Sequence, residues 1–319
     1  MDDEAFTKLA EDLDAELLNG ATSVAILGAT HTALRLVARL AATGLDACVS
    51  GIYTDRPVLP TLRVPVRPVE QLRDVAVDVL VVAADETKED LLLGALPHLA
   101  GSPKVIVAGY GHLAFRDQTY HQELAGLLVP SLANGYPNTL PHLYQCLTNA
   151  ARLGLRGVVA EFGIFKGGTT MFLSRVIERL GADWPVIGFD TFDGFPARRS
   201  PLDMYDHPGC IFTDLAGVRR YLNGRNVEIV PGDIATTAHR LADEDVVCTF
   251  VDTDNYTPAR AAIEVVQERT VTGGAIVFDH FTGTDRFRYT LGERLAALPL
   301  LDDPRYLHLH GTGVFYRQG

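Results

Sequence analysis

The sequence predicts an α/β protein of two domains, and three observations predict it. Short apolar runs alternate with helical patterns along most of the chain, which is typical of parallel sheets covered by helices. Two such series follow one another, each with a glycine-containing turn after its first strand. The length of 319 residues is about twice that of a typical single domain. We therefore expect a domain over residues 1–117, a connector with an entry helix over 118–155, and a second domain over 156–319.

The first domain is expected to open with an amphipathic helix and to continue as a small parallel sheet. Apolar residues recur at the three- and four-residue spacing of one helix face at Phe6, Leu9, Leu13 and Leu17. A second helix is expected over 33–43. Apolar runs predict strands over 23–27, 47–53, 77–83 and 104–108.

The second domain repeats the α/β pattern over more strands. Strands are expected over 157–162, 186–190, 227–230, 246–252 and 274–279, and helices over 142–153, 170–180, 215–222, 258–269 and 289–298. Two alternating runs flank Gly311 near the end of the chain. They predict an antiparallel hairpin at the edge of a mostly parallel sheet.

Composition excludes several classes of partner. The formal net charge is −12 and the isoelectric point is about 5.2, so binding to nucleic acid or to an anionic membrane surface is not expected. No apolar run approaches the ~18 residues that span a bilayer. The four cysteines form no CxxC pair and are typical of free thiols in a reducing compartment. We expect a cytoplasmic protein, a monomer or a homo-oligomer, whose partner is a small molecule.

The glycine turn of the first domain is a degenerate dinucleotide-binding motif. Strand 23–27 leads into Gly28, but Thr30 stands where a second glycine would let a pyrophosphate approach the backbone. Asp55 is placed to meet a ribose, yet it lies in a turn where aspartate is common for other reasons. We expect this Rossmann-like domain to bind no nucleotide. The alternative is an NAD(P)-linked oxidoreductase that uses it.

The glycine turn of the second domain has the features of a ligand site. It follows strand 157–162 and reads Glu161-Phe-Gly163-Ile-Phe-Lys166-Gly167-Gly168-Thr169-Thr170. Three glycines in six residues let a ligand lie against bare backbone, and the N–H groups that open the next helix favour an anion such as a carboxylate. The next strand ends at Asp190, where an acid can accept both hydroxyls of a ribose. No GxxxxGK[ST] motif occurs, so a triphosphate is not expected.

Four longer motifs occur in a family order: EFGIFKGGTT, VIGFDTFDGFP, VDTDNY and GGAIVFDH. Over about residues 140–290 the chain resembles the macrocin O-methyltransferase family, which includes noviose O-methyltransferases. The resemblance implies a class I methyltransferase fold with S-adenosylmethionine as methyl donor. In many members it also implies Mg²⁺-dependent transfer to a sugar hydroxyl, which suits antibiotic or other natural-product biosynthesis.

The resemblance also places the donor on particular residues. Asp190 would hold its ribose, and the turn Gly232-Asp233 would lie near its adenine. The residues implied around its amino-acid end are Glu161, Gly163, Lys166, Gly167, Gly168 and Thr169.

Acidic residues end two further strands of the second domain. Strand 246–251 runs into Asp252-Thr-Asp254-Asn-Tyr256, and strand 274–278 runs into Asp279-His280. If the strands are neighbours, their ends lie roughly 5 Å apart. Asp252, Asp279 and His280 can then share a divalent cation that also binds the acceptor hydroxyl, with Asp252 as the proton acceptor. Asp254 is expected instead to cap the following helix, with Pro258 in its first turn.

The histidine leaves the metal and the reaction open. Where the family commonly has a second aspartate, this chain has His280, and an imidazole suits Mn²⁺ better than Mg²⁺. His280 is alternatively a general base that acts without a metal. Transfer of the methyl group to nitrogen or carbon is compatible with the same residues.

A long irregular segment over 193–212 is expected to cover the acceptor, because a loop of this length without secondary structure is typical of a lid. The expected substrate contacts are Arg198 and Tyr205 in this segment and Tyr256 after the strand over 246–252.

Overall fold

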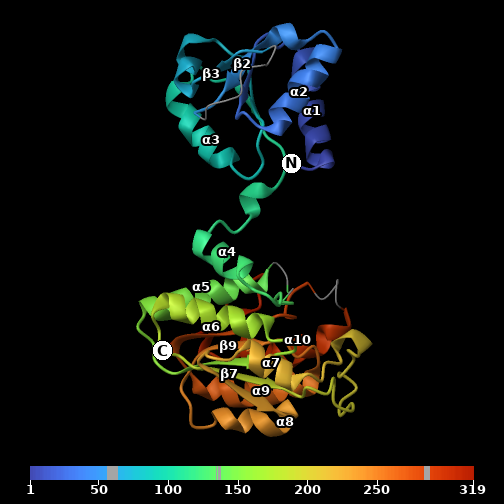
Figure 1. Cartoon of the computed structure of the whole chain (residues 1–319), viewed down its shortest axis with the longest axis vertical. Helices are drawn as coiled ribbons and strands as arrows, with labels where there is room; N and C mark the ends of the chain where they lie inside the picture. Colours follow the sequence, from blue (N-terminus) through green and yellow to red (C-terminus); the bar gives the residue numbers. More distant parts are fainter. Residues whose placement is uncertain (56–63, 134, 136–137, 284–287) are drawn as a thin grey trace. The chain divides into compact units, whose positions relative to one another are not determined.

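The computed structural model describes residues 1–55, 64–133, 135, 138–283 and 288–319. Within these ranges the chain divides into two units, Met1–Phe115 and Arg116–Gly319. Each unit is a sheet with helices packed against it, so the predicted α/β class is confirmed (Figure 1).

The N-terminal unit contains a five-stranded parallel sheet with the order β3-β2-β1-β4-β5. Its strands are β1 (Val24–Leu27), β2 (Val49–Tyr53), β3 (Val66–Arg67), β4 (Val79–Val82) and β5 (Lys104–Ile106). Its α-helices are α1 (Asp3–Leu18), α2 (His31–Ala42) and α3 (Lys88–Ala95). The four predicted strands are present. β3 was not predicted, because two residues are too few to show a pattern.

Thr30 has a structural role at the first glycine turn. It is the N-cap residue of α2, and its hydroxyl oxygen accepts the backbone N–H of Ala33 at 3.2 Å. The same hydroxyl donates to the carbonyl of Ala83, just after β4. Thr30 therefore links the start of α2 to the end of β4. This is the edge at which sheets of this kind bind nucleotides.

Lys88 occupies the neighbouring part of this edge. Its side chain is only 4% exposed, and its ammonium lies 2.8 Å from the Asp85 carboxylate. It also donates to the carbonyls of Ala108 at 2.9 Å and Gly109 at 2.6 Å. The buried charge is thus fully paired by the protein's own groups.

The C-terminal unit contains a seven-stranded sheet with the order β11-β12-β10-β9-β6-β7-β8. Its strands are β6 (Val158–Phe162), β7 (Val186–Asp190), β8 (Val227–Pro231), β9 (Val246–Val251), β10 (Thr270–Phe278), β11 (Tyr306–His308) and β12 (Val314–Arg317). Its α-helices are α4 (Gln118–Ala125), α5 (Thr139–Arg152), α6 (Gly168–Leu180), α7 (Leu215–Tyr221), α8 (Ile234–Thr237), α9 (Tyr256–Arg269) and α10 (Leu291–Ala297). β12 pairs antiparallel with β10 and β11, which confirms the predicted hairpin.

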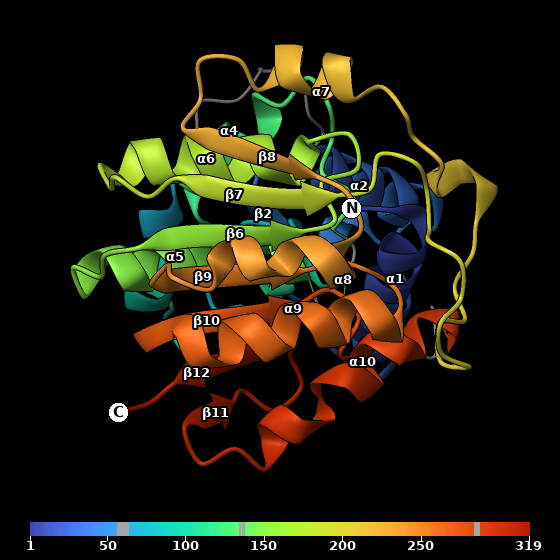
Figure 2. The same ribbon diagram turned by 90° about the horizontal axis from the view of Figure 1, so that it is seen from below.

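Helices cover both faces of this sheet (Figures 1 and 2). α5 and α6 lie on one face, and α8, α9 and α10 lie on the other. In the core, the rings of Phe162 and Phe189 stack with their centroids 4.7 Å apart. The short helix α4, which contacts α6, was expected only as part of a connector.

The strand register brings the acid-bearing ends together. Phe162 of β6 and Phe278 of β10 both lie opposite Val251 of β9. The N–H of Asp252 donates to the Phe162 carbonyl, and the N–H of Asp279 donates to the Val251 carbonyl, both at 2.9 Å. The two strands that run into these acids, β9 and β10, are therefore neighbours in the sheet, as predicted.

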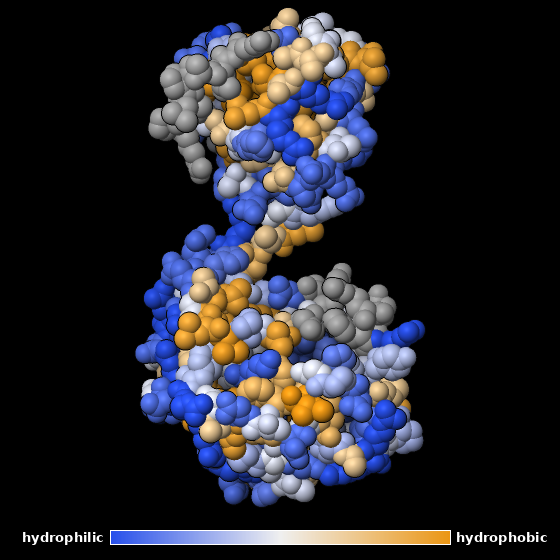
Figure 3. All heavy atoms as spheres, turned by 45° about the vertical axis from the view of Figure 1, so that its right-hand side comes forward, coloured by the Kyte–Doolittle hydropathy of each residue, from blue (hydrophilic) through white to orange (hydrophobic). Residues whose placement is uncertain are grey.

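Figure 3 shows apolar residues gathered in several patches, with polar residues around them. Large apolar residues that are more than half exposed include Leu18, Leu93, Leu96, Tyr110, Leu113, Leu128 and Ile211. Among the described residues, no helix combines the length and the apolar character that crossing a membrane requires.

Candidate active site

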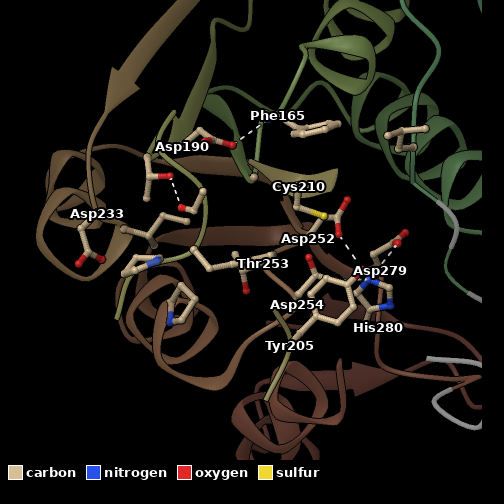
Figure 4. Close-up of a pocket in the computed structure, with 18 residues that line it drawn as sticks. Phe165, Asp190, Tyr205, Cys210, Asp233, Asp252, Thr253, Asp254, Asp279 and His280 are labelled. Carbon is tan, nitrogen blue, oxygen red and sulfur yellow. Dashed lines mark hydrogen bonds and ion pairs between the residues drawn. The ribbon is translucent and has the colours of Figure 1, made fainter. Parts of the chain in front are cut away.

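A cavity of about 290 Å³ lies at the carboxyl edge of the C-terminal sheet. This is where open α/β sheets bind ligands. Figure 4 shows Asp190 and Asp233 toward one end of the cavity and the group around Asp252 toward the other. The predicted site residues that line it are Gly163, Asp190, Tyr205, Asp233, Asp252, Asp279 and His280.

Gly163 lets β6 and β9 end in close contact. Its φ of 103° is in the region that favours glycine, and its N–H donates to the Phe189 carbonyl at 2.9 Å. A Cβ atom at this position would lie 2.0 Å from the carbonyl oxygen of Asp252. Any other residue would therefore force the backbone at residue 163 or at Asp252 to shift.

Asp190, at the end of β7, fixes two turns of the cavity wall. Its Oδ2 accepts the N–H of Phe165 at 2.8 Å, and its Oδ1 accepts the N–H of Phe192 at 2.7 Å. These aromatic residues have φ values of 52° and 51°, a conformation that costs on the order of 1–3 kcal/mol outside glycine. Burial raises the pKa of Asp190 although both bonds oppose it. Each oxygen keeps a lone pair for a ligand hydroxyl.

Glu161 is a buried acid with open hydrogen-bonding capacity. It lies on β6, is 0% exposed, and is not among the residues that line the cavity. Among the described residues, no group hydrogen-bonds either of its carboxyl oxygens. Burial raises the pKa of Glu161 to about 8, with the nearby Thr170 hydroxyl opposing the shift. A buried carboxyl group without a hydrogen-bond partner is energetically costly, so a hydrogen-bond donor on a ligand fits here.

Lys166 lies beside two aromatic rings of the glycine turn and the following loop. It is exposed, and its ammonium lies over the rings of Phe165 at 4.9 Å and Phe212 at 5.7 Å. It is not among the lining residues. Its contact with a ligand stays a prediction.

The other glycines of this turn bring the chain close to a preceding segment. Gly167 has a φ of 81° and is the N-cap residue of α6. A Cβ atom on Gly168 would lie 2.2 Å from the carbonyl oxygen of Pro130. The Thr169 hydroxyl is 2.7 Å from that of Ser131. These residues shape the turn from behind and do not themselves line the cavity.

Asp233 connects the cavity to the segment over 193–212. Its side chain caps α8 and also forms an ion pair with Arg199. The N–H of the preceding Gly232 donates to the Asp190 carbonyl at 2.8 Å, but Gly232 does not line the cavity. Arg198 is exposed and is likewise absent from the lining.

Asp252, Asp254 and His280 form a compact group of possible metal ligands. One ligand atom of each lies within 4.8 Å of the others. The Nε2 atom of His280 is 3.0 Å from Oδ1 of Asp254 and 3.6 Å from Oδ1 of Asp252. This spacing suits one cation, because ligand atoms about 2.0–2.2 Å from an ion lie about 3–4 Å from one another.

Asp279 lies beside this group and also lines the cavity. It is 1% exposed, and its Oδ1 accepts the backbone N–H of Gly135 at 3.0 Å. Its Oδ2 lies 3.6 Å from Nε2 of His280. The three residues predicted to share a cation, Asp252, Asp279 and His280, are thus brought together. Asp254 lies closer to the imidazole than Asp252 or Asp279 does.

Asp254 does not cap the following helix, which corrects the sequence prediction. α9 begins at Tyr256, earlier than predicted, and its N-cap residue is Asn255. Asp254 has a φ of 59°, and this left-handed turn aims its carboxylate at His280. Asn255 instead exchanges two hydrogen bonds of 2.9 Å with the backbone of Tyr205.

Glu293 of α10 joins the two loops that carry this group, and sequence reasoning missed it. Its Oε2 accepts the N–H groups of Thr253 at 2.8 Å and Asp254 at 3.0 Å. Its Oε1 accepts the N–H of His280 at 2.9 Å. Glu293 is fully buried, whereas in the sequence it is one acid within LGERLAA, with no motif around it.

Several carboxyl groups surround the one imidazole. Burial, together with the charges of Asp279, Asp254 and Glu293, raises the pKa of Asp252 well above its usual range. Burial lowers the pKa of His280, but the hydrogen bond to Asp254 and the surrounding negative charges outweigh it and raise the pKa to about 9. Either a proton on the imidazole or a cation between the carboxylates relieves such crowding.

The segment over 193–212 contributes apolar and aromatic surface to the cavity. Its lining residues are Gly194, Phe195, Pro196, Tyr205 and Cys210. The ring of Tyr205 packs edge-on against Phe195 at 5.5 Å. Burial and the charge of Asp254 raise the pKa of Tyr205 to about 12, so its phenol stays protonated. Tyr256, the third predicted substrate contact, packs against the core and does not line the cavity.

Asp203 anchors this segment to α9. Its Oδ1 accepts the Thr257 N–H and its Oδ2 accepts the Thr257 hydroxyl, both at 2.7 Å. The Oδ2 atom also accepts the N–H groups of Arg199 at 3.0 Å and Ser200 at 2.9 Å. Burial opposes ionisation, but these bonds hold the pKa of Asp203 below its usual range.

Comparison with known proteins agrees with this geometry. A family model described as a methyltransferase domain matches residues 160–281, which run from β6 to just past His280. The C-terminal unit therefore contains a methyltransferase domain. With the relatives below, this confirms the predicted resemblance to the macrocin-type O-methyltransferases and the predicted enzyme class.

Two curated relatives are O-methyltransferases. The chain is 25% identical over 194 residues to the 8-demethyl-8-(2,3-dimethoxy-alpha-L-rhamnosyl)-tetracenomycin-C 4'-O-methyltransferase of Streptomyces olivaceus, covering 56% of this chain and 72% of the relative. It is 26% identical over 157 residues to the mycinamicin III 3''-O-methyltransferase of Micromonospora griseorubida, covering 44% and 62%. Among solved structures, it is similar to the O-methyltransferase NovP, with 17% identity and a TM-score of 0.47 over 56% of this chain and 78% of that chain.

Proposed function

We propose that this protein transfers the methyl group of S-adenosylmethionine to a sugar hydroxyl of a natural-product intermediate, assisted by a divalent cation. One observation carries the proposal: a single cavity has Asp190 toward one end and the group of Asp252, Asp254 and His280 toward the other. Both curated relatives support the acceptor class, since their names describe O-methyltransferases of tetracenomycin and mycinamicin compounds.

The residues near the glycine turn fit S-adenosylmethionine. The buried and unpaired oxygens of Glu161 suit the ammonium of its amino-acid end. The remaining lone pairs of Asp190 suit its ribose hydroxyls. Phe195 and Ile234 provide apolar surface for its adenine beside Asp233. When bound, the donor supplies an electrophilic methyl group on a sulfonium.

The acid group fits a divalent cation. Asp252 and Asp254 would each supply a carboxylate oxygen and His280 would supply Nε2, while Asp279 stays a candidate ligand because of its 3.6 Å contact with the same nitrogen. A set that includes an imidazole suits Mn²⁺ better than Mg²⁺. A bound cation would lower the pKa of an acceptor hydroxyl that it contacts.

The chain's own residues then position the acceptor and hold its proton. Asp252 is the expected proton acceptor, because its side chain is 21% exposed at the cavity and burial raises its pKa, which makes the carboxylate a stronger base. The absence of a side chain at Gly163 leaves room for the backbone of Asp252 beside the donor site. The segment over 193–212 would exclude water around the acceptor. The rate would then depend mainly on the alignment of the methyl donor with the acceptor.

Donor binding and metal dependence are tested separately. Calorimetry with S-adenosylhomocysteine should show one site per chain, weakened by about 1–3 kcal/mol in Asp190→Ala and unchanged in the exposed control Asp193→Ala. Methylation of a panel of glycosylated natural products, followed by mass spectrometry, should stop in EDTA and recover better with Mn²⁺ than with Mg²⁺. Full activity in EDTA together with an inactive His280→Ala variant would defeat the metal and make His280 the general base.

A further inference from the structure

Glu293 is a buried acid that touches the proposed metal group only through the backbone. It lies on α10, is 0% exposed, and does not line the cavity. Its carboxylate bonds three N–H groups, two in the loop after β9 and one in the loop after β10. One side chain therefore connects the two loops from which the candidate ligands come.

These bonds set Asp254 and His280 relative to each other. Their backbone N–H groups bond to different oxygens of one rigid carboxylate, at 3.0 Å and 2.9 Å. Asp254 also has a φ of 59°, which a residue other than glycine keeps only where its surroundings hold it. Glu293 supplies such a restraint on the amide of Asp254.

The helix that carries Glu293 is itself held closely. A Cβ atom on the preceding Gly292 would lie 2.2 Å from the carbonyl oxygen of Leu202 and 2.9 Å from the backbone nitrogen of Tyr256. α10 therefore packs directly against the start of α9 and against the segment over 193–212. Glu293 cannot shift with its helix unless this contact opens.

Charge is the second reason to connect Glu293 with the metal group. Glu293 is a fully buried carboxyl group that hydrogen-bonds the N–H groups of Asp254 and His280, so its negative charge lies close to the other acids of the group. A cation among Asp252, Asp254 and His280 would offset the repulsion among these charges. The arrangement is thus consistent with a site whose loops are fixed in advance for a positive ion.

We propose that Glu293 is a positioning residue that holds Asp254 and His280 in the geometry for a divalent cation, an inference that rests on the proposed function above. Glu293→Gln tests it with little change in shape. An amide has only one accepting oxygen, so its NH₂ group must face either the His280 N–H or the Thr253 and Asp254 N–H groups. At least one loop then loses its bond.

The experiment measures Mn²⁺ binding to the full chain by electron paramagnetic resonance, with calorimetry of S-adenosylhomocysteine on the same samples. Glu293→Gln should weaken Mn²⁺ binding about 10–100-fold and change donor affinity less than about twofold. Leu300→Ala is the matched control, because Leu300 is 1% exposed in η8 (Leu298–Leu301), next to α10, and makes none of the three hydrogen bonds that Glu293 makes to the loops. It should lower the melting temperature and leave Mn²⁺ affinity unchanged.

The possible outcomes separate this inference from the proposed function. Equal Mn²⁺ affinity in wild type and Glu293→Gln would overturn the positioning role and leave the cation in place. Absence of Mn²⁺ binding in the wild type would overturn the cation and the positioning role together. If Glu293→Gln does not fold, Glu293→Asp keeps the charge but shortens the reach, and unchanged affinity in that variant would equally overturn the inference.

Discussion

The Nε2 atom of His280 lies 3.0 Å from Oδ1 of Asp254, closer than to the nearest oxygen of Asp252 or Asp279, each 3.6 Å away. Asp279 is further constrained because its other oxygen accepts the Gly135 N–H. A cation bound by the imidazole would therefore meet Asp254 and Asp252 first.

Asp254→Asn should weaken Mn²⁺ binding by at least about tenfold, because it removes a ligand charge without changing side-chain size. Affinity for S-adenosylhomocysteine should change less than about twofold. The matched control is Asp206→Asn, the same change at an exposed position of the segment over 193–212. A larger loss of Mn²⁺ affinity in Asp279→Asn than in Asp254→Asn would show instead that Asp279 is the inner ligand.

Glu161→Gln should stabilise the unliganded protein in alkaline solution. Burial raises the pKa of Glu161 from 4.5 to about 8, so the folded chain holds a proton that the unfolded chain loses. Stability contributed by this group is therefore present below pH 4.5 and decreases as the pH rises toward 8. The variant cannot ionise, so its advantage should be near zero at pH 4.5 and on the order of 5 kcal/mol at pH 9.

Thermal denaturation of both proteins across this pH range measures the effect. The same variant should bind S-adenosylhomocysteine about tenfold more weakly, because it loses the charge that pairs with the donor ammonium. A constant difference in melting temperature at all pH values would contradict the raised pKa of the buried Glu161. Unchanged donor affinity would contradict only its role in binding.

Asp203→Ala should loosen the segment over 193–212 and raise the KM for the acceptor by about tenfold or more. The variant removes four hydrogen bonds that tie residues 199 and 200 to Thr257 at the start of α9. Donor affinity should change little, because Asp190 and Gly163 are untouched. Steady-state kinetics with each substrate varied in turn makes the test, and an equal rise in both KM values would indicate general unfolding of the site.

The positions of the acids followed from sequence because each buried strand runs directly into one, and parallel strands end at one edge. Asp190, Asp252 and Asp279 were found in this way. The turn at Asp254 was misjudged, because its conformation depends on Glu293, 39 positions further along the chain. A fully buried carboxyl in a short helix has no local signature.

The second glycine turn shows the same limit. Gly163 is needed by a contact with Asp252, but Gly168 is needed by the approach of Pro130. In the sequence, the two residues cannot be distinguished, because both are glycines in the same turn. Only the tertiary neighbour distinguishes a glycine that opens a ligand site from one that admits another part of the chain.

Thr30→Ala should destabilise the N-terminal unit without affecting the donor site. Removing the hydroxyl deprives the Ala33 N–H at the start of α2 and the Ala83 carbonyl of their partner, which costs about 1 kcal/mol for a helix cap. The single tryptophan, Trp184, lies in the other unit, so hydrogen exchange of peptides over 31–42 is the suitable measurement. Thr7→Ala, an exposed position within α1, is the control and should leave this exchange unchanged. If Thr30 serves the helix rather than a pyrophosphate, neither NAD nor NADP should bind at micromolar concentration, and saturable binding of either would contradict this role.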